Sequence, residues 1–246
     1  MIVKIGDYEL NRYYFEDALE ALKKIPNNSF DLCLTDPPYN VDVGCLGADR
    51  MRITPGARKA NYNFYDKKKK YDDVIADYEN FCKAWFTEVK RVCTKIVFTP
   101  GTSNFCTWIK IEEPKEILIH YKPDCVGFTH SIRFLKHEYI LCYGKFRPFE
   151  FKNSVITTQL GSEETKRLGI EHASPKAIQL WRILLSRIKP RTVLDPFVGS
   201  GTTIQACIEQ GIDYLCFEID KAYESDILKR VHSAVKMPKT KQIKAI

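Results

Sequence analysis

The sequence predicts an α/β protein built on a doubly wound, mostly parallel β-sheet. Short apolar runs, which are typical of buried parallel strands, alternate with segments whose apolar residues recur at helical spacing. Two of these runs end in turns of distinctive composition: Asp36-Pro37-Pro38-Tyr39, called here the proline turn, and residues 195–203, called the glycine turn. Ligands of doubly wound sheets bind where strands end, so both turns are candidate sites.

Composition sets the limits of this prediction. A chain of 246 residues, 44% of them hydrophobic, fits one large α/β domain, and we expect a single domain over residues 1–246. The 9 cysteines form no Cys-x-x-Cys pair and no zinc-like cluster with histidine, so we expect reduced core thiols and no metal. No leader or membrane-spanning run is recognisable, which predicts a cytoplasmic protein without a membrane partner. The net charge of +7 is compatible with a polyanionic partner but does not require one.

The beginning of the chain predicts a βαβ unit. A strand over residues 8–14 leads to a helix from residue 18, which Pro26 stops, and then to a strand over residues 31–35. Asp17 stands directly before the helix. Its favoured interpretation is the helix N-cap, and the alternative is an acid that touches a ligand at the edge of the sheet.

The proline turn is rigid, because neither proline has an N–H and each has φ near about −65°. It offers a carboxylate, main-chain carbonyls of fixed direction and the aromatic face of Tyr39. These groups suit a flat ligand that carries an NH2 group and stacks on the tyrosine. An ordinary turn at the end of a strand is the alternative.

Residues 41–73 lose all apolar periodicity and mix basic residues with aromatics. This composition predicts a flexible basic loop that grips a nucleic-acid backbone, and a solvated surface loop is the alternative.

The middle of the chain continues the α/β alternation. We expect a helix over 78–92, a strand over 95–99, a helix from about residue 103, and strands over 116–121 and 138–143. Residues 144–170 are richer in basic and polar residues, which makes them a candidate target-recognition segment or a surface excursion. Ser174 as N-cap and Pro175 at the first helical position then predict a helix that ends before Pro190.

The last third holds the glycine turn between a strand over 192–194 and a helix that ends at Gly211. A Gly199-x-Gly201 turn before a helix is a nucleotide-type cradle. The dinucleotide fingerprint is incomplete, because Ile204 stands where Gly or Ala belongs, and a phosphate-binding Gly-Lys-Ser/Thr is absent. Asp195 begins the turn, and Glu218 ends the next strand at the place of a ribose-binding acid.

Together these motifs resemble those of the S-adenosylmethionine-dependent DNA amino-methyltransferases in the permuted order often called the beta class. The proline turn is similar to the family's catalytic motif, and the glycine turn is similar to its cofactor loop. Residues 172–176 resemble the motif that precedes the cofactor strand, although Ser-Pro-Lys stands for the usual Gln-Lys-Pro. Glu16-Asp17 takes the place of the family's Gly-Asp, which favours a contact between Asp17 and the cofactor's adenine. The resemblance covers nearly the whole chain.

This resemblance implies a seven-stranded, circularly permuted, Rossmann-like methyltransferase fold with S-adenosyl-L-methionine as cofactor and DNA as partner. The implied catalytic residues are Asp36, Pro37, Pro38 and Tyr39. The implied cofactor-binding residues are Asp17, Asp36, Ser174, Lys176, Asp195, Phe197, Gly199, Ser200, Gly201, Thr202, Thr203, Glu218 and Ile219. A homodimer and a cognate restriction endonuclease, as in restriction-modification pairs, are further candidate partners.

The expected reaction is methylation of adenine N6, because Asp-Pro-Pro-Tyr is commoner in that branch of the family. Cytosine N4 is the first alternative. The Asp36 carboxylate and the Pro37 carbonyl would accept the two hydrogens of the amine of a flipped base, without a covalent enzyme intermediate. Other classes stay open: an NAD-dependent oxidoreductase that uses the glycine turn, a DNA-binding module without catalysis, or a methyltransferase acting on RNA or protein.

Overall fold

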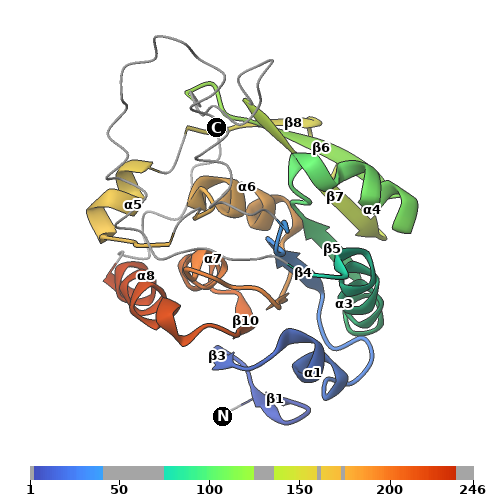
Figure 1. Ribbon diagram of the computed structural model, residues 1–246. Coiled ribbons are helices and arrows are strands. Elements are labelled where there is room, and N and C mark those ends of the chain that lie inside the picture. The colour runs from blue at the N-terminus through green and yellow to red at the C-terminus, as the bar shows by residue number, and fades with distance from the viewer. Residues whose placement is uncertain (1–2, 41–74, 125–135, 160–161, 173–174, 237–246) are drawn as a thin grey trace.

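The fold is organised around an eight-stranded sheet in a computed structural model that describes residues 3–40, 75–124, 136–159, 162–172 and 175–236 (Figure 1). Five of the seven strand pairs are parallel, which confirms the predicted α/β class with a mostly parallel sheet. The strands lie in the order β3 (Arg12–Phe15), β10 (Asp213–Glu218), β9 (Thr192–Asp195), β4 (Leu32–Thr35), β5 (Lys95–Phe98), β7 (His137–Gly144), β6 (Glu116–Tyr121) and β8 (Val155–Thr157).

Two details of the sheet differ from the prediction. The sheet has eight strands rather than seven, because β8 joins its edge from within residues 144–170. The strand expected over residues 8–14 is divided, because Asn11 has φ 61° and turns the chain. Its first part, β2 (Tyr8–Glu9), pairs instead with β1 (Lys4–Ile5) in a separate hairpin.

Helices cover both faces of the sheet (Figure 1). One face packs on α1 (Ala18–Lys23), α3 (Tyr78–Val92) and α4 (Phe105–Ile111), and the other on α6 (Ile178–Ile188), α7 (Thr202–Gln210) and α8 (Glu224–Lys236). Strand β4 is buried on both faces, because Cys33 enters the first core while Leu32 and Leu34 enter the second. The predicted core role of Trp85 is confirmed, since its side chain is fully buried. Of the described cysteines, all have free thiols and only Cys106 is exposed.

The start of α6 corrects a prediction. The helix begins at Ile178 with Ala177 at the N-cap position, not at Pro175. Lys176 precedes the helix, and its ammonium group lies 2.7 Å from Glu138 Oε2 on β7. Lys176 contacts the sheet at Glu138 instead of forming part of the first helical turn that Pro175 favours. Ser174, the loop over residues 41–73 and the tail after residue 236 lie outside the described residues.

The centre of the sheet is the point where its strand order reverses. Strands β4 and β9 are parallel neighbours, with Cys33 paired to Leu194. The chain continues from β4 to β5 on one side and from β9 to β10 on the other. The proline turn follows β4 and the glycine turn follows β9, so both end in the crevice where such sheets bind ligands. Among the described helices, none has the length and apolar character needed to cross a membrane.

Candidate active site

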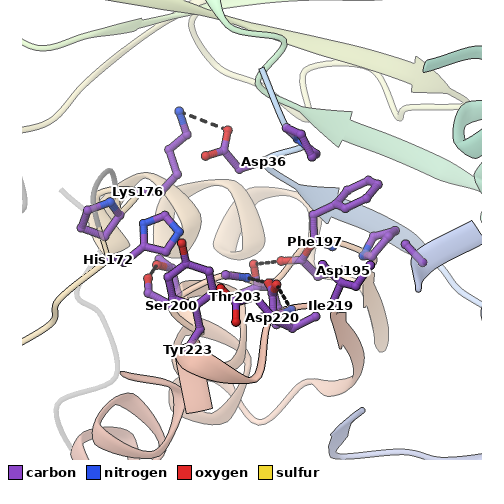
Figure 2. A pocket seen from close by; sticks show the side chains of 18 of the residues that line it. Asp36, His172, Lys176, Asp195, Phe197, Ser200, Thr203, Ile219, Asp220 and Tyr223 are labelled. Atoms are coloured by element: carbon purple, nitrogen blue, oxygen red, sulfur yellow. Dashed lines mark hydrogen bonds and ion pairs between the residues drawn. The ribbon is translucent and has the colours of Figure 1, made fainter. Parts of the chain in front are cut away.

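The two turns meet at the end of the sheet. The hydroxyl of Thr35, the last residue of β4, donates a hydrogen bond of 2.6 Å to Asp195 Oδ1 at the end of β9. A cavity of about 560 Å³ lies between the turns, and Figure 2 shows the side chains of 18 of the residues that line it. This volume is within the range of small-molecule sites.

Asp36 lies at one wall of the cavity. Its Oδ1 atom receives hydrogen bonds from the hydroxyls of Tyr39 and Thr99, and the Lys176 ammonium lies 3.2 Å from the same atom (Figure 2). No described residue donates to Oδ2. Burial raises the pKa of Asp36 above its usual value, while the positive charge of Lys176 acts in the opposite direction. Oδ1 is therefore held by protein donors, while Oδ2 has none among the described residues.

The carbonyl groups of the proline turn also differ in whether they accept a hydrogen bond. Tyr78 Oη donates to the Pro38 carbonyl at 2.8 Å, and Asn104 Nδ2 donates to the Tyr39 carbonyl at 2.7 Å. Among the described residues, none donates to the carbonyl of Pro37. Two acceptors of the proline turn, Asp36 Oδ2 and the Pro37 carbonyl oxygen, thus have no donor within the described part of the chain.

The ring of Tyr39 lines the cavity and packs closely against Gly101. A Cβ atom at position 101 would lie 3.0 Å from two ring atoms, so the backbone there must be bare. Gly101 also has φ 72°, a conformation that favours glycine. The position of the tyrosine ring depends on this glycine.

Asp195 ties the glycine turn together. Only 2% of it is exposed, and its Oδ1 accepts from Thr35 and from the Phe197 amide at 3.0 Å, while Oδ2 accepts from Thr203. Burial raises the pKa of Asp195 to about 6, although these hydrogen bonds favour the charged form. Asp195 lines the cavity, but its oxygens already have protein donors.

Glu218 closes the opposite wall. Its Oε2 atom accepts from the Gly199 amide at 2.8 Å, and Oε1 accepts from the Asp220 amide at 2.9 Å. Burial raises the pKa of this carboxyl group. A Cβ atom at Gly199 would lie 3.1 Å from His172 Nε2, so the main chain passes close to a neighbouring side chain here. Each carboxylate oxygen retains acceptor capacity beyond one amide bond.

Most of the expected site residues meet at this cavity. Those that line it are Asp17, Asp36, Pro38, Tyr39, Lys176, Asp195, Phe197, Gly199, Ser200, Thr202, Thr203, Glu218 and Ile219. The N-cap interpretation of Asp17 is confirmed, because its carboxylate accepts from the Glu20 amide of α1 at 3.1 Å, and its contact with a ligand stays a prediction. Gly201 is not among the lining residues. It has φ 83° and faces Ile227 of α8, so its role here is close packing.

Several lining residues were missed by the sequence interpretation, among them His172, Asp220 and Tyr223. The main-chain amide of His172 donates a hydrogen bond of 2.9 Å to the buried carboxylate of Asp226. The centroid of its ring lies 4.6 Å from that of the Tyr223 ring. The sequence feature that could have identified His172 as a site residue is its position at the start of the 172–176 motif. Asp220 and Tyr223 carried no such signal, because their place depends on how the chain turns after β10.

Residues 144–170 divide between two edges of the sheet. Glu150 forms an ion pair of 2.7 Å with Lys95 at the start of β5, which is the edge away from the cavity. Strand β8 then runs parallel to β6 and ends beside Thr158, whose hydroxyl lies 2.7 Å from His120 Nε2. The helix α5 (Ser162–Leu168) follows. Of this segment, the end of β8 lies at the edge that carries the cavity, while α5 contacts Arg182 of α6 and Gln205 of α7.

Comparisons with known proteins agree with this geometry. The family described as DNA methylase, of the N6/N4 type, matches residues 30–229, which include both turns. The Type II methyltransferase M.HinfI of Haemophilus influenzae is 26% identical, over 92% of this chain and 69% of its own length.

Solved structures of low identity share the fold. The PvuII DNA methyltransferase, which is cytosine-N4-specific, is 16% identical with a TM-score of 0.61, covering 89% of this chain and 85% of its own. The complex of M1.HpyAVI with S-adenosylmethionine is 18% identical with a TM-score of 0.57, covering 89% of this chain and 98% of its own. The chain therefore belongs to the N6/N4 DNA methylase family, the S-adenosyl-L-methionine-dependent enzymes that methylate exocyclic amino groups of DNA bases.

Proposed function

We propose that this protein methylates the exocyclic N6 amine of an adenine flipped out of DNA. The observation that carries the proposal is that some acceptor atoms of the proline turn have protein donors and others have none among the described residues. Protein donors converge on Asp36 Oδ1, and no described residue donates to Oδ2 or to the Pro37 carbonyl. Two acceptors on one rigid turn match the two hydrogens of an NH2 group.

The residues around the cavity fit S-adenosyl-L-methionine. Glu218 would accept hydroxyl groups of the ribose, as carboxylates at strand ends do. Ile219, which is 71% exposed, and Phe197 offer apolar surface to an adenine ring. The cofactor, when bound, supplies an electrophilic methyl group on a sulfonium. We propose the other expected residues as its surroundings: Asp17, Asp36, Ser174, Lys176, Asp195, Gly199, Ser200, Gly201, Thr202 and Thr203.

Asp36 and Pro37 would act on the amine directly. An exocyclic amine is a weak nucleophile because its lone pair is delocalised into the ring. By accepting both hydrogens, Asp36 Oδ2 and the Pro37 carbonyl would favour a tetrahedral nitrogen whose lone pair points away from the turn. As the nitrogen–methyl bond forms, the methyl–sulfur bond of the bound cofactor would break and leave a neutral thioether. The methylated nitrogen must then lose one proton, which the Asp36 carboxylate would accept. Catalysis then comes from alignment and fixed charges.

Tyr39 contacts both Asp36 and Lys176. The tyrosine hydroxyl donates to Asp36, and Lys176 lies 2.6 Å from the same hydroxyl. We propose that the ring of Tyr39, supported by Gly101, stacks on the flipped base. Cytosine N4 is the second candidate acceptor, since cytosine also carries an NH2 beside a ring nitrogen and the structurally similar PvuII enzyme is cytosine-N4-specific.

Two segments are proposed to contact DNA outside the base pocket, because both carry basic residues. Residues 144–170 are the candidate target-recognition segment, and α5 within them carries the basic residues Lys166 and Arg167. The basic residues within 41–73 are the second candidate. A homodimer would extend the DNA covered, and pairing with a restriction endonuclease stays a prediction. Sedimentation with and without DNA tests the dimer.

Labelled methyl transfer tests the main proposal. The protein is incubated with methyl-labelled S-adenosyl-L-methionine and unmethylated genomic DNA, and the DNA is digested to nucleosides. Label in N6-methyl-2′-deoxyadenosine is the expected result, and label in N4-methyl-2′-deoxycytidine would select the second candidate. Absence of label from the DNA would refute a DNA substrate.

A further inference from the structure

Glu138 is a buried acid beside the candidate active site to which the family motifs quoted above give no role. It is 7% exposed and lies at the start of β7. Because β7 runs antiparallel to β5, with Leu141 opposite Phe98, its first residues lie at the edge where β4 and β5 end. Glu138 does not line the cavity, so any effect on the reaction passes through other side chains.

The ammonium of Lys176 bridges Glu138 and Asp36. It lies 2.7 Å from Glu138 Oε2 and 3.2 Å from Asp36 Oδ1. Burial disfavours the ammonium form, but the two carboxylates hold the pKa of Lys176 well above its usual value. Burial likewise opposes ionisation of Glu138, yet Lys176 and His120 hold its pKa well below the usual value. Lys176 is thus a fixed cation shared by two acids.

The other oxygen of Glu138 is held from the neighbouring strands. Oε1 lies 2.7 Å from Nδ1 of His120, its register partner on β6, and 3.6 Å from Lys122 Nζ. A carboxylate only accepts, so Nδ1 donates to it, and Nε2 of a neutral ring accepts from Thr158 at 2.7 Å. His120 is 1% exposed, and these contacts fix the direction of the Glu138 carboxylate.

We propose that Glu138 is a positioning residue that holds Lys176 against Asp36 and thereby keeps Asp36 ionised for the reaction. The inference rests on the proposed function. A long lysine side chain has many rotamers, and a second carboxylate at 2.7 Å restricts them to the one that reaches the proline turn. Among the described residues, the titratable groups that face this cluster are Asp36, Tyr39, His120, Lys122, Glu138, Lys176 and, through its interaction with Asp36, Asp195.

The sign of one pH effect separates this role from simple electrostatics. If Glu138 acted only by its own negative charge, its removal would make Asp36 easier to ionise. If Glu138 acts by holding Lys176, its removal frees the ammonium and makes Asp36 harder to ionise. The two accounts therefore shift the acidic limb of the pH–rate profile in opposite directions.

The test compares Glu138→Gln with Glu150→Gln. Glu150 is a matched control, because it is 8% exposed and pairs with Lys95 at the same 2.7 Å, at the edge of the sheet away from the cavity. Single-turnover methyl transfer to unmethylated genomic DNA is measured from pH 5 to 9, together with cofactor binding and thermal unfolding. We expect Glu138→Gln to slow transfer at neutral pH by about 10- to 100-fold. Its acidic limb should move up by about one pH unit or more, the effect of an opposite charge at this distance.

Each outcome decides the proposal. A limb that moves to lower pH in Glu138→Gln, or a profile equal to that of Glu150→Gln, overturns it. Absence of transfer by the unaltered protein at every pH refutes the proposed function instead. If Glu138→Gln does not fold, Thr158→Val removes the hydroxyl that orients His120 and carries the same test, with a smaller upward shift expected and an unchanged limb as the contrary result.

Discussion

The Thr35 hydroxyl donates a 2.6 Å hydrogen bond to Asp195, and it thereby joins the ends of β4 and β9 beneath the cavity. Both side chains are buried, with Thr35 at 0% and Asp195 at 2% exposure. This bond links the proline turn to the glycine turn, so the proposed site for the base and the proposed site for the cofactor share one support.

We expect Thr35→Val to destabilise the protein by about 1–3 kcal/mol, because a buried carboxylate loses a donor. The loss should be larger at pH 7.5 than at pH 5, since ionised Asp195 needs the donor more. Chemical denaturation at both pH values measures it. Thr35→Ser, which keeps the hydroxyl but removes a methyl group, is the control, and equal pH dependence in both variants would contradict the assignment.

Asp195 also predicts a pH dependence of stability. Burial raises its pKa in the folded protein from 3.8 to about 6, so the folded state binds the proton more tightly than the unfolded state. Between pH 3.8 and about 6, the free energy of unfolding contributed by Asp195 therefore falls as the pH rises. Asp195→Asn removes the titration. Relative to the unaltered protein, this variant should gain about 3 kcal/mol between pH 3.5 and 7.5, since a tenfold change in proton affinity is about 1.4 kcal/mol.

Denaturation curves of Asp195→Asn and of the unaltered protein, taken across that pH range, provide the measurement. The comparison isolates Asp195, because every other titrating group is common to both proteins. A stability difference that does not vary with pH would show that Asp195 has an ordinary pKa.

The sequence predicted the two turns because their signal is local. Proline and glycine fix the backbone of each turn, and the apolar runs before them show that each follows a buried strand. The strand pairing then brings the turns together at one edge of the sheet. Glu138 and His120 escaped the same procedure, because each looks like one residue of an apolar strand. Their role depends on an antiparallel register that places them opposite each other.

The start of α6 shows the limit of local rules. Ser-Pro before an apolar periodic segment favours an N-cap and first turn. The contact of Lys176 with Glu138 lies far outside that window in sequence, and it holds Lys176 before the helix. Similarly, nothing local announces that Asn11 turns the chain and divides one expected strand into two.

Asp36→Ala should lower methyl transfer by at least about 100-fold, because it removes the charged acceptor for the amine. Cofactor affinity should remain measurable, since Glu218 and the glycine turn are unaltered. Asp31→Asn is a suitable control, because Asp31 directly precedes the same strand and pairs with Arg191 at the other edge of the sheet. Near-normal turnover in Asp36→Ala would refute the assigned chemistry.

Glu218→Gln should weaken binding of S-adenosyl-L-methionine by about tenfold or more, because hydrogen bonds to a charged acceptor are stronger than those to an amide. The Gly199 amide donor would retain an oxygen acceptor, so the turn itself should persist. Calorimetry on the protein without DNA measures the affinity. Asp213→Asn alters an acid at the opposite end of β10 and should bind normally. Equal affinity in the two variants would remove Glu218 from the cofactor site.

Gly101→Ala tests whether the reaction depends on the packing of the Tyr39 ring against the backbone of Gly101. The added Cβ would lie 3.0 Å from the tyrosine ring, so the ring has to shift by a few tenths of an ångström, which changes its alignment with Asp36. Alanine at φ 72° also carries a backbone cost of about 1–2 kcal/mol. Gly169→Ala separates the two effects, because Gly169 has φ 63° and open space around its Cβ position. We expect similar losses of stability in both variants but slower single-turnover transfer only in Gly101→Ala, and equal transfer rates would show that the position of the Tyr39 ring does not limit the reaction.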